Sequence, residues 1–370
     1  MKSAQMHKVF ICSWQDSGDT MKLTSVHVKG LFATFDHTIN LRPEGLTFIH
    51  SPNGLGKSTL VRMIYDLFRG DLENLAEVPF ERAEFVFDDD MTLILIPDHE
   101  GMGITLEKNE IVNDVSEPEA RSLLDVTYVG PRRLYIPNLD GTYRSAISVY
   151  SEQLADKLRN AQEALAADPW ELPSRLESQT MDADELLHWA KELKARVDFM
   201  RDAGLEVSVP SPHRFPPRPI DIREDREGNE ILMDHISAMV DRHYRLAESV
   251  TVYQDIVNSM FIGKNIRVDD QQGIRVLLSD GSQLDVERLS SGETQLLLIL
   301  YRLLFNASSG SLVILDEPEI SLHVSWQQKL SSILLDISRL RQLQIIVATH
   351  SPQIVHDKWD LTEELRAEIA

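Results

Sequence analysis

The sequence predicts an α/β fold that is built from both ends of the chain and interrupted by a helical insert. Three observations predict it. A strand, a glycine-rich turn and a helix follow one another over residues 46–70. An alternation of helices and apolar strands resumes after residue 289 and continues to the end. Between these two parts, apolar residues recur at helical spacing over residues 147–199.

The charge, the apolar stretches and the cysteine content of the chain argue against several classes of protein. The chain has 370 residues, and its 59 acidic side chains outnumber 37 Lys and Arg, so the formal net charge is −22. This argues against a surface that coats nucleic acid or an anionic membrane, although a local basic groove stays open. The longest apolar stretch, residues 296–305, is too short to span a bilayer. Cys12 is the single cysteine, which excludes an internal disulfide and favours a reducing, cytoplasmic location.

The N-terminal part of the chain is expected to hold a tail, residues 1–21, and then the first half of the α/β domain, residues 22–146. Alternating or apolar runs predict strands in this half at 23–28, 46–49, 83–87, 92–96 and 126–129. We expect the last three to form a meander beside the glycine-rich turn. A helix is predicted over 59–68, closed by Gly70.

The insert is expected over residues 147–259. It contains two predicted helices of roughly 20 residues, each about 30 Å long, a proline-rich linker at 210–219, and a helix from 231 to about 260. The apolar stripes of the first two helices fit a recognition surface or a plain two-helix core. The second half of the α/β domain is expected over 260–370, with strands at 265–268, 274–278, 283–286, 312–315 and 344–347.

The turn before the first helix has the composition of a phosphate-binding loop. It consists of Asn53, Gly54, Leu55, Gly56, Lys57, Ser58 and Thr59, preceded by Ser51 where the usual pattern has glycine. Glycines allow backbone N–H groups to converge on an anion, and the helix N-terminus adds a favourable dipole. Lys57 would reach the β- and γ-phosphates of ATP, and the Ser58 hydroxyl would ligate Mg²⁺.

A second phosphate-contacting candidate precedes the apolar helix predicted at 294–306. It consists of Leu289, Ser290, Ser291, Gly292 and Glu293. Ser290 and Glu293 have the spacing of a helix capping box, which is a sufficient structural reason for these residues. A capped helix start also presents free N–H groups to an anion, so the two interpretations are compatible.

Two further candidates follow apolar strands in the second half. Asp316 and Glu317 come directly after the strand 312–315, and His350 follows the strand 344–347. Ligands bind at the carboxyl ends of strands in open α/β sheets. Asp316 is placed to hold Mg²⁺, Glu317 to position or deprotonate water, and His350 to contact the γ-phosphate.

Taken in order, these motifs resemble ABC-class ATPases, and within them the non-transporter SMC, RecF and OLD-like branch. The resemblance covers about residues 22–133 and 260–359, and the stretch Asp316–His323 is similar to the OLD-like and RecF-like form. It implies an ABC-type ATPase head, with a mixed sheet, flanking helices and an antiparallel β-subdomain. It also implies that Ser290, Ser291, Gly292 and Glu293 form the signature segment, which caps ATP held by an opposite subunit.

Two departures from the family pattern and one further likeness to it are informative. No glutamine lies between Lys57 and Gln153, so the Mg²⁺-supporting glutamine loop is not recognisable and another group or a water must replace it. Arg132 and Arg133 stand in a segment similar to an arginine-bearing one of the OLD-like branch, and they fit either a phosphate or partner contact or a solvated turn. Only 20 residues follow His350, so we expect no attached TOPRIM nuclease domain.

The leading hypothesis is an ATPase that dimerises head to tail around two ATP molecules and controls a separate nuclease or toxin subunit. Stand-alone chains of this kind resemble the ATPase components of anti-phage systems of the PARIS, Septu and retron types. The alternative is a RecF-like repair ATPase acting directly on DNA, for which the candidate bases are Arg132, Arg133, Arg144, His213, Arg214, Arg218 and Arg223. The missing glutamine loop and the large insert argue against a transporter subunit.

Overall fold

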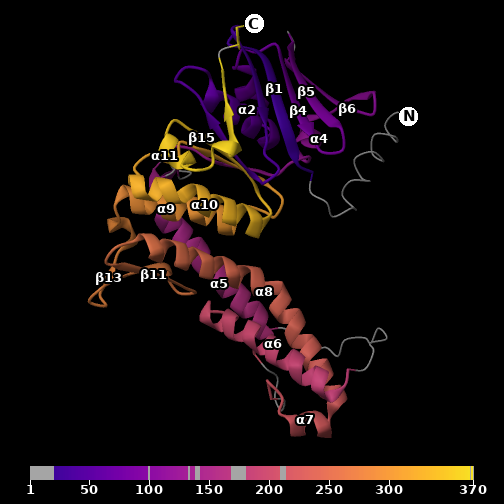
Figure 1. Cartoon of the computed structure of the whole chain (residues 1–370), viewed down its shortest axis with the longest axis vertical. Coiled ribbons are helices and arrows are strands. Elements are labelled where there is room, and N and C mark those ends of the chain that lie inside the picture. The colour runs from indigo at the N-terminus through magenta and orange to yellow at the C-terminus, as the bar shows by residue number, and fades with distance from the viewer. Residues whose placement is uncertain are drawn as a thin grey trace. The chain divides into compact units, whose positions relative to one another are not determined.

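The computed structural model describes residues 21–98, 101–131, 134–137, 142–167, 181–208, 214–366 and 368–369 (Figure 1). The chain divides into two compact units. Unit 1 comprises residues 1–133 and 302–370, and unit 2 comprises residues 134–301. The expected tail, Met1–Thr20, lies outside the described residues. The sequence predicts a different division, in which an insert over residues 147–259 separates two halves of one domain. This assignment of segments to domains stays a prediction.

Unit 1 contains a five-stranded parallel sheet. Its strand order is β16 (Thr362–Glu364), β3 (Leu46–His50), β15 (Gln344–Thr349), β14 (Leu312–Asp316) and β8 (Val126–Val129). All four neighbouring pairs are parallel. The carboxyl ends of these strands therefore meet at one edge of the sheet.

A separate antiparallel sheet of seven strands completes the β structure of unit 1 (Figure 1). Its order is β17 (Glu368–Ile369), β2 (Phe35–Asn40), β1 (Leu23–Leu31), β4 (Arg82–Phe87), β5 (Met91–Asp98), β6 (Gly101–Lys108) and β7 (Ile111–Asp114). The predicted α/β class, with helices on parallel and antiparallel strands, is confirmed. The expected antiparallel β-subdomain is present, whereas the other sheet, expected to be mixed, pairs its five strands in parallel throughout.

The expected position of residues 126–129 was wrong. They were predicted to continue the meander, but β8 pairs in parallel with β14 in the other sheet, Val126 lying opposite Leu312. The physical reason is that a short apolar run in the sequence indicates a buried strand but does not indicate which other strand it pairs with. The meander itself is confirmed for β4 and β5, which pair antiparallel.

The core of unit 1 lies around α2 (Lys57–Arg69). Apolar side chains of this helix, among them Leu60 and Ile64, join one buried cluster with residues of both sheets, such as Phe85 of β4 and Ile314 of β14. The helix ends at Gly70, as predicted, in a left-handed conformation with φ 80°. The other helices of unit 1 are α3 (Leu72–Ala76), α4 (Glu117–Arg121), η2 (Arg302–Asn306), α10 (Val324–Arg341), α11 (Pro352–Val355) and η3 (Trp359–Leu361).

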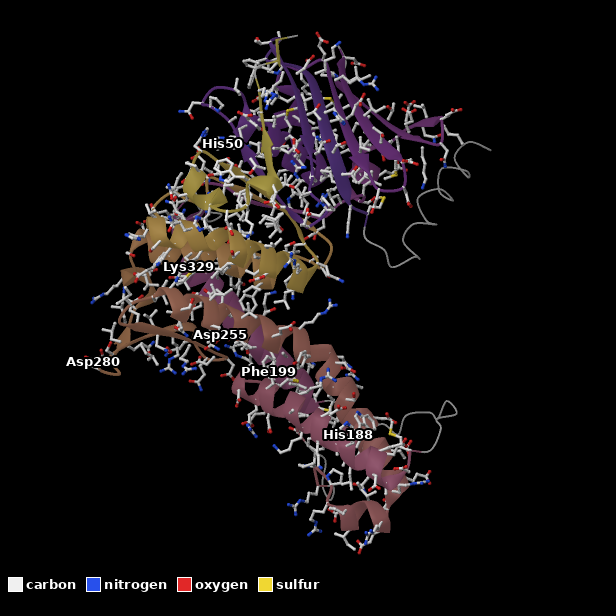
Figure 2. All side chains as sticks on the ribbon, viewed as in Figure 1. His50, His188, Phe199, Asp255, Asp280 and Lys329 are labelled. Atoms are coloured by element: carbon white, nitrogen blue, oxygen red, sulfur yellow. The ribbon has the colours of Figure 1, made fainter. Side chains whose placement is uncertain are left out.

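Unit 2 is mainly helical. It contains α5 (Ala146–Ala167), α6 (Ala183–Asp202), α7 (Pro219–Glu224), α8 (Arg226–Met260), η1 (Val286–Arg288) and α9 (Ser291–Tyr301). The two expected insert helices are thus present as α5 and α6, and α6 packs along α8. In that contact the ring of Phe199, labelled in Figure 2, lies 5.2 Å from the ring of Tyr244. The segment between α5 and α6, residues 168–180, and part of the proline linker lie outside the described residues.

Two small sheets complete unit 2. One pairs β9 (Tyr135–Pro137) with β10 (Tyr143–Ser145), and the other contains β11 (Lys264–Asp269), β12 (Gly273–Leu278) and β13 (Gln283–Leu284). The predicted helix over 294–306 begins earlier, as α9, and its last five residues adopt the π-type turn η2. No helix in the described ranges is long and apolar enough to cross a membrane.

Candidate functional site

The glycine-rich turn follows β3 and leads into α2, as the sequence predicts. Gly54 and Gly56 have φ angles of 90° and 79°, in the left-handed region that favours glycine. A side chain at Gly56 would also meet Leu31, because a Cβ atom there would lie 2.8 Å from Leu31 Cδ2. Gly56 is the N-cap of α2, so the loop delivers the N-terminus of a 13-residue helix to the site.

A buried histidine outside the predicted motif supports this loop. His37 of β2 is 4% exposed, and its Nε2 atom lies 2.8 Å from the carbonyl oxygen of Leu55. The His37 ring stacks on that of Phe35 at 5.7 Å between centroids. The antiparallel sheet therefore holds the middle of the loop from the side, a contact for which the sequence carries no local signal.

Lys57 is the central cation of the site. It is 4% exposed, and its Nζ donates a hydrogen bond of 2.9 Å to the carbonyl oxygen of Thr349, at the end of β15. Burial lowers the pKa of Lys57 to about 8. Opposing this shift, in decreasing order, are the charges of Glu319, Asp316 and Glu317. An anion placed here would gain both the lysine charge and the helix dipole.

Ser58 and Asp316 form an oxygen-rich pair beside Lys57. The Ser58 hydroxyl donates to Asp316 Oδ1 at 3.2 Å, and Asp316 is 2% exposed at the end of β14. Hydroxyl and carboxylate oxygens are the donors that Mg²⁺ prefers, so the pair suits this ion.

Tyr128, at the end of β8, holds the other oxygen of the same carboxylate. Its hydroxyl donates to Asp316 Oδ2 at 2.8 Å. Burial, and then the neighbouring Asp316, raise the pKa of Tyr128 above its ordinary value, so the phenol stays protonated and remains a donor. A Cβ atom at Gly130 would lie 2.6 Å from the Tyr128 ring, so the glycine permits this ring position. Sequence reasoning missed this role, although it had noted that another group must replace the absent glutamine.

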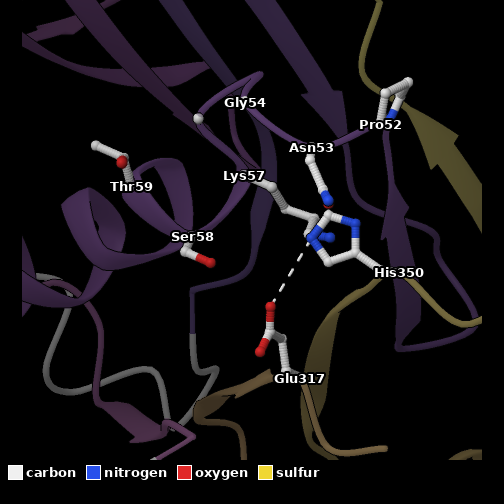
Figure 3. Close-up of a pocket in the computed structure, with 9 residues that line it drawn as sticks. Pro52, Asn53, Gly54, Lys57, Ser58, Thr59, Glu317 and His350 are labelled. Carbon is white, nitrogen blue, oxygen red and sulfur yellow. Dashed lines mark ion pairs between the residues drawn. The ribbon is translucent and has the colours of Figure 1, made fainter.

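Glu317 and His350 face each other across the site (Figure 3). Their Oε1 and Nε2 atoms are 3.8 Å apart, and His350 Nδ1 lies 3.1 Å from the carbonyl oxygen of Ser51. Glu317 has a φ of 49°, an uncommon conformation for a residue with a side chain. Its N–H donates to the Ala348 carbonyl at 2.8 Å, which ties the turn after β14 to β15.

Lys57, Ser58, Glu317 and His350 line one pocket of about 580 Å³. Asp316, which accepts the Ser58 hydrogen bond, is not among the lining residues. The walls of the pocket come from the glycine-rich loop, the start of α2 and the ends of β14 and β15, and they comprise Pro52, Asn53, Gly54, Gly56, Lys57, Ser58, Thr59, Glu317 and His350 (Figure 3). The pocket thus combines an anion-binding helix start, a buried cation and a carboxylate with an adjacent imidazole. Of the predicted loop residues, Leu55 does not line it, and its carbonyl instead contacts His37.

Comparison with known families agrees with this geometry. The family described as "AAA domain, putative AbiEii toxin, Type IV TA system" (AAA_21) matches residues 52–356. The chain belongs to the AAA_21 family. It is a P-loop ATPase family, and membership implies nucleotide binding.

Other relatives of this AAA_21 chain are more distant. Protein ea59 of Escherichia phage lambda is 35% identical over 92 residues, which span 25% of this chain and 17% of that protein. An Smc head domain from Pyrococcus furiosus, bound to the C-terminal domain of ScpA, is 14% identical with 94% of each chain covered and a TM-score of 0.48. The SMC head domain of Thermotoga maritima is 14% identical, covers 93% of this chain and 94% of that one, and has a TM-score of 0.44.

The second phosphate-contacting candidate of the AAA_21 chain lies in unit 2, at the start of α9. The predicted capping box is confirmed there: the Ser290 N–H and hydroxyl both donate to Glu293 Oε2 at 2.9 Å, and the Glu293 N–H donates to Ser290 Oγ at 3.3 Å. Lys264 Nζ contacts both carboxylate oxygens, at 2.6 and 2.7 Å. Burial alone raises the pKa of Glu293, but the bonds from Lys264 and Ser290 outweigh it and the net shift is downward.

Two predicted contacts cannot be located. Arg132 and Arg133 lie outside the described residues, between β8 and β9. Their roles in contacting phosphate or a partner stay predictions.

Proposed function

We propose that this chain binds ATP with Mg²⁺ in the unit 1 pocket and hydrolyses it to ADP and phosphate. The single observation that carries the proposal is the convergence of Lys57, the Ser58–Asp316 pair and Glu317 at one edge of the parallel sheet. These groups come from segments more than 250 residues apart, so a fortuitous acidic turn or glycine turn does not account for them.

The residues take distinct roles in this proposal. The loop N–H groups and Lys57 bind the β- and γ-phosphates. Ser58 and Asp316 would hold Mg²⁺, which when bound neutralises charge on the phosphate oxygens. Asn53, Gly54 and Thr59 line the same pocket, which supports a place for them beside the phosphates.

Glu317 and His350 act at the scissile end. Glu317 accepts a proton from a water molecule while the oxygen of that water attacks the γ-phosphorus. The bond between the γ-phosphorus and the β–γ bridging oxygen then breaks. His350 lies 3.8 Å from Glu317 and donates to a γ-phosphate oxygen. Lys57 and His350 would stabilise the negative charge that develops on the phosphoryl oxygens in the transition state.

We further propose that two chains pair head to tail around ATP. Ser290 and the N–H groups of Ser291 and Gly292 from one copy would then bind the γ-phosphate held by the other. The support is the α9 start, where the capping box orients Ser290 and Lys264 neutralises Glu293. Without that neutralisation, the Glu293 carboxylate would repel an incoming phosphate.

The output of this ATPase is proposed to be control of a separate nuclease or toxin subunit in anti-phage defence. ATP would stabilise a closed pair of chains, and hydrolysis would release it. The description of the AAA_21 family, which names a toxin of a type IV toxin–antitoxin system, supports a link to such systems.

Direct action on DNA gains no comparable support. Two of the four described candidate bases are paired with carboxylates: Arg144 with Glu152 at 2.6 Å and Arg218 with Asp221 at 2.8 Å. Each of these guanidinium groups is thus already engaged by a carboxylate of its own chain.

Phosphate release from ATP by the purified chain tests the ATPase proposal. The proposal expects Mg²⁺-dependent turnover that is lost in Lys57→Ala and retained in Glu77→Ala, an exposed glutamate of unit 1. Equal turnover in wild type and Lys57→Ala would point to a contaminating enzyme and contradict the proposal.

A further inference from the structure

The carboxylate of Glu319 joins two motifs that the sequence separates by 30 residues. One oxygen, Oε1, accepts three hydrogen bonds from consecutive residues of the turn after β15. The donors are the Thr349 hydroxyl at 2.6 Å, the His350 N–H at 3.0 Å and the Ser351 N–H at 3.2 Å. A carboxylate that accepts several backbone and hydroxyl donors fixes the turn that carries them.

Neighbouring bonds hold the other side of this turn. The Ser351 hydroxyl donates to Gln327 Oε1 at 2.8 Å, and Gln327 Nε2 donates to the Leu322 carbonyl at 2.9 Å. The segment that carries Glu319 is itself constrained, since Ser321 has a φ of 66°. Such a conformation persists only where surrounding contacts determine it.

The turn held by Glu319 presents two groups to the nucleotide pocket. The Thr349 carbonyl accepts the Lys57 ammonium at 2.9 Å, and the His350 ring lies 3.1 Å from Ser51 and 3.8 Å from Glu317. Glu319 also contributes the largest of the carboxylate charges acting on Lys57. It is not itself among the residues that line the pocket.

We propose that Glu319 is a positioning residue that holds the Thr349–Ser351 turn so that the His350 ring faces the γ-phosphate. This inference rests on the proposed ATPase function and deepens it. Glu319 acts through other residues and does not touch the nucleotide.

The test compares turnover at saturating ATP with ATP affinity in Glu319→Ala, Glu319→Gln, His350→Ala and the double variant Glu319→Ala/His350→Ala. Glu319→Ala is expected to lower kcat by about 10- to 100-fold, in the range of other losses of an oriented polar group. Glu319→Gln keeps an acceptor oxygen and is expected to recover at least half of wild-type kcat. Glu77→Ala is the matched control and should equal wild type.

The double variant separates positioning from general stabilisation. If Glu319 acts through His350, its removal in the His350→Ala background should change kcat by less than about 2-fold. Losses that multiply in the double variant, or a wild-type kcat in Glu319→Ala, would overturn the inference.

A second variant covers the case in which Glu319→Ala does not fold. Thr349→Val removes one of the three donors and keeps the side-chain shape, and it should lower kcat by about 3- to 10-fold. Unchanged kcat in a folded Thr349→Val would count against the inference. Absence of Lys57-dependent turnover in wild type would instead overturn the proposed function, and the inference with it.

Discussion

The Lys57 ammonium donates a 2.9 Å hydrogen bond to the Thr349 carbonyl, linking the start of α2 to the end of β15. The lysine is thus held over the phosphate pocket while its burial disfavours the charged form. Phosphate binding would compete with the carbonyl for this cation, and it would also favour the protonated state.

ATP affinity is therefore expected to depend on pH through Lys57. The pKa of about 8 belongs to the free chain, and a bound triphosphate raises it. Affinity should be level below pH 8 and fall by up to about 10-fold per unit above it, because binding then requires proton uptake. Calorimetry between pH 7.5 and 9.5 tests this, in a range where a terminal phosphate with pKa near ~6 is already ionised.

The control for this titration is Lys57→Met, which keeps much of the aliphatic stem and has no titrating group. Its affinity should be weaker by about 100-fold at pH 7.5 and should not vary over the range. A wild-type affinity that stays constant to pH 9.5 would contradict the role given to the buried ammonium.

In Tyr128→Phe, the Mg²⁺ concentration that gives half-maximal turnover is expected to rise by about 3- to 10-fold. The variant removes the 2.8 Å bond that orients Asp316 and keeps the ring, which packs 5.3 Å from that of Tyr65. Titration of activity with Mg²⁺ measures the effect. Gly130→Ala should have a similar effect, since its Cβ atom would displace the Tyr128 ring.

The matched control is Tyr65→Phe, which alters the neighbouring ring without touching Asp316. An unchanged Mg²⁺ midpoint in Tyr128→Phe, with the same midpoint in Tyr65→Phe, would remove Tyr128 from the account of the metal site.

Ser290→Arg should block pairing of two chains without weakening ATP binding to one. Ser290 directly precedes α9 in unit 2, whereas the pocket residues all belong to unit 1. A large cation at the capping box would obstruct the approach of a second copy. ATP affinity near wild type, combined with a loss of turnover of about 10-fold or more, is the expected pattern; full turnover would exclude a composite site.

Much of the site could be predicted from the sequence because its groups follow local patterns. Strand and glycine-turn patterns in the sequence mark the positions of Lys57, Ser58, Asp316 and His350. Parallel pairing of β3, β15 and β14 then brings the carboxyl ends of these strands together. The Ser290 capping box was likewise predictable, since it depends on residues three apart.

The supporting contacts could not be predicted in the same way. Tyr128, His37 and Glu319 contact groups that are distant in sequence, and each contact depends on sheet pairing that periodicity does not encode. The wrong position of residues 126–129 has the same origin. A sequence pattern that indicated pairing of β8 with β14 would also have made Tyr128 a candidate to replace the missing glutamine.

The mass of Glu317→Gln in solution with ATP and Mg²⁺ tests the central proposal most directly. The variant keeps the pocket and removes the base, so ATP should persist and hold two chains together. Light scattering during size-exclusion chromatography should give twice the mass of the 42.1 kDa chain with ATP, and the single-chain mass without nucleotide or in Ser290→Arg/Glu317→Gln. A Glu317→Gln chain that binds ATP and keeps the single-chain mass would contradict the account.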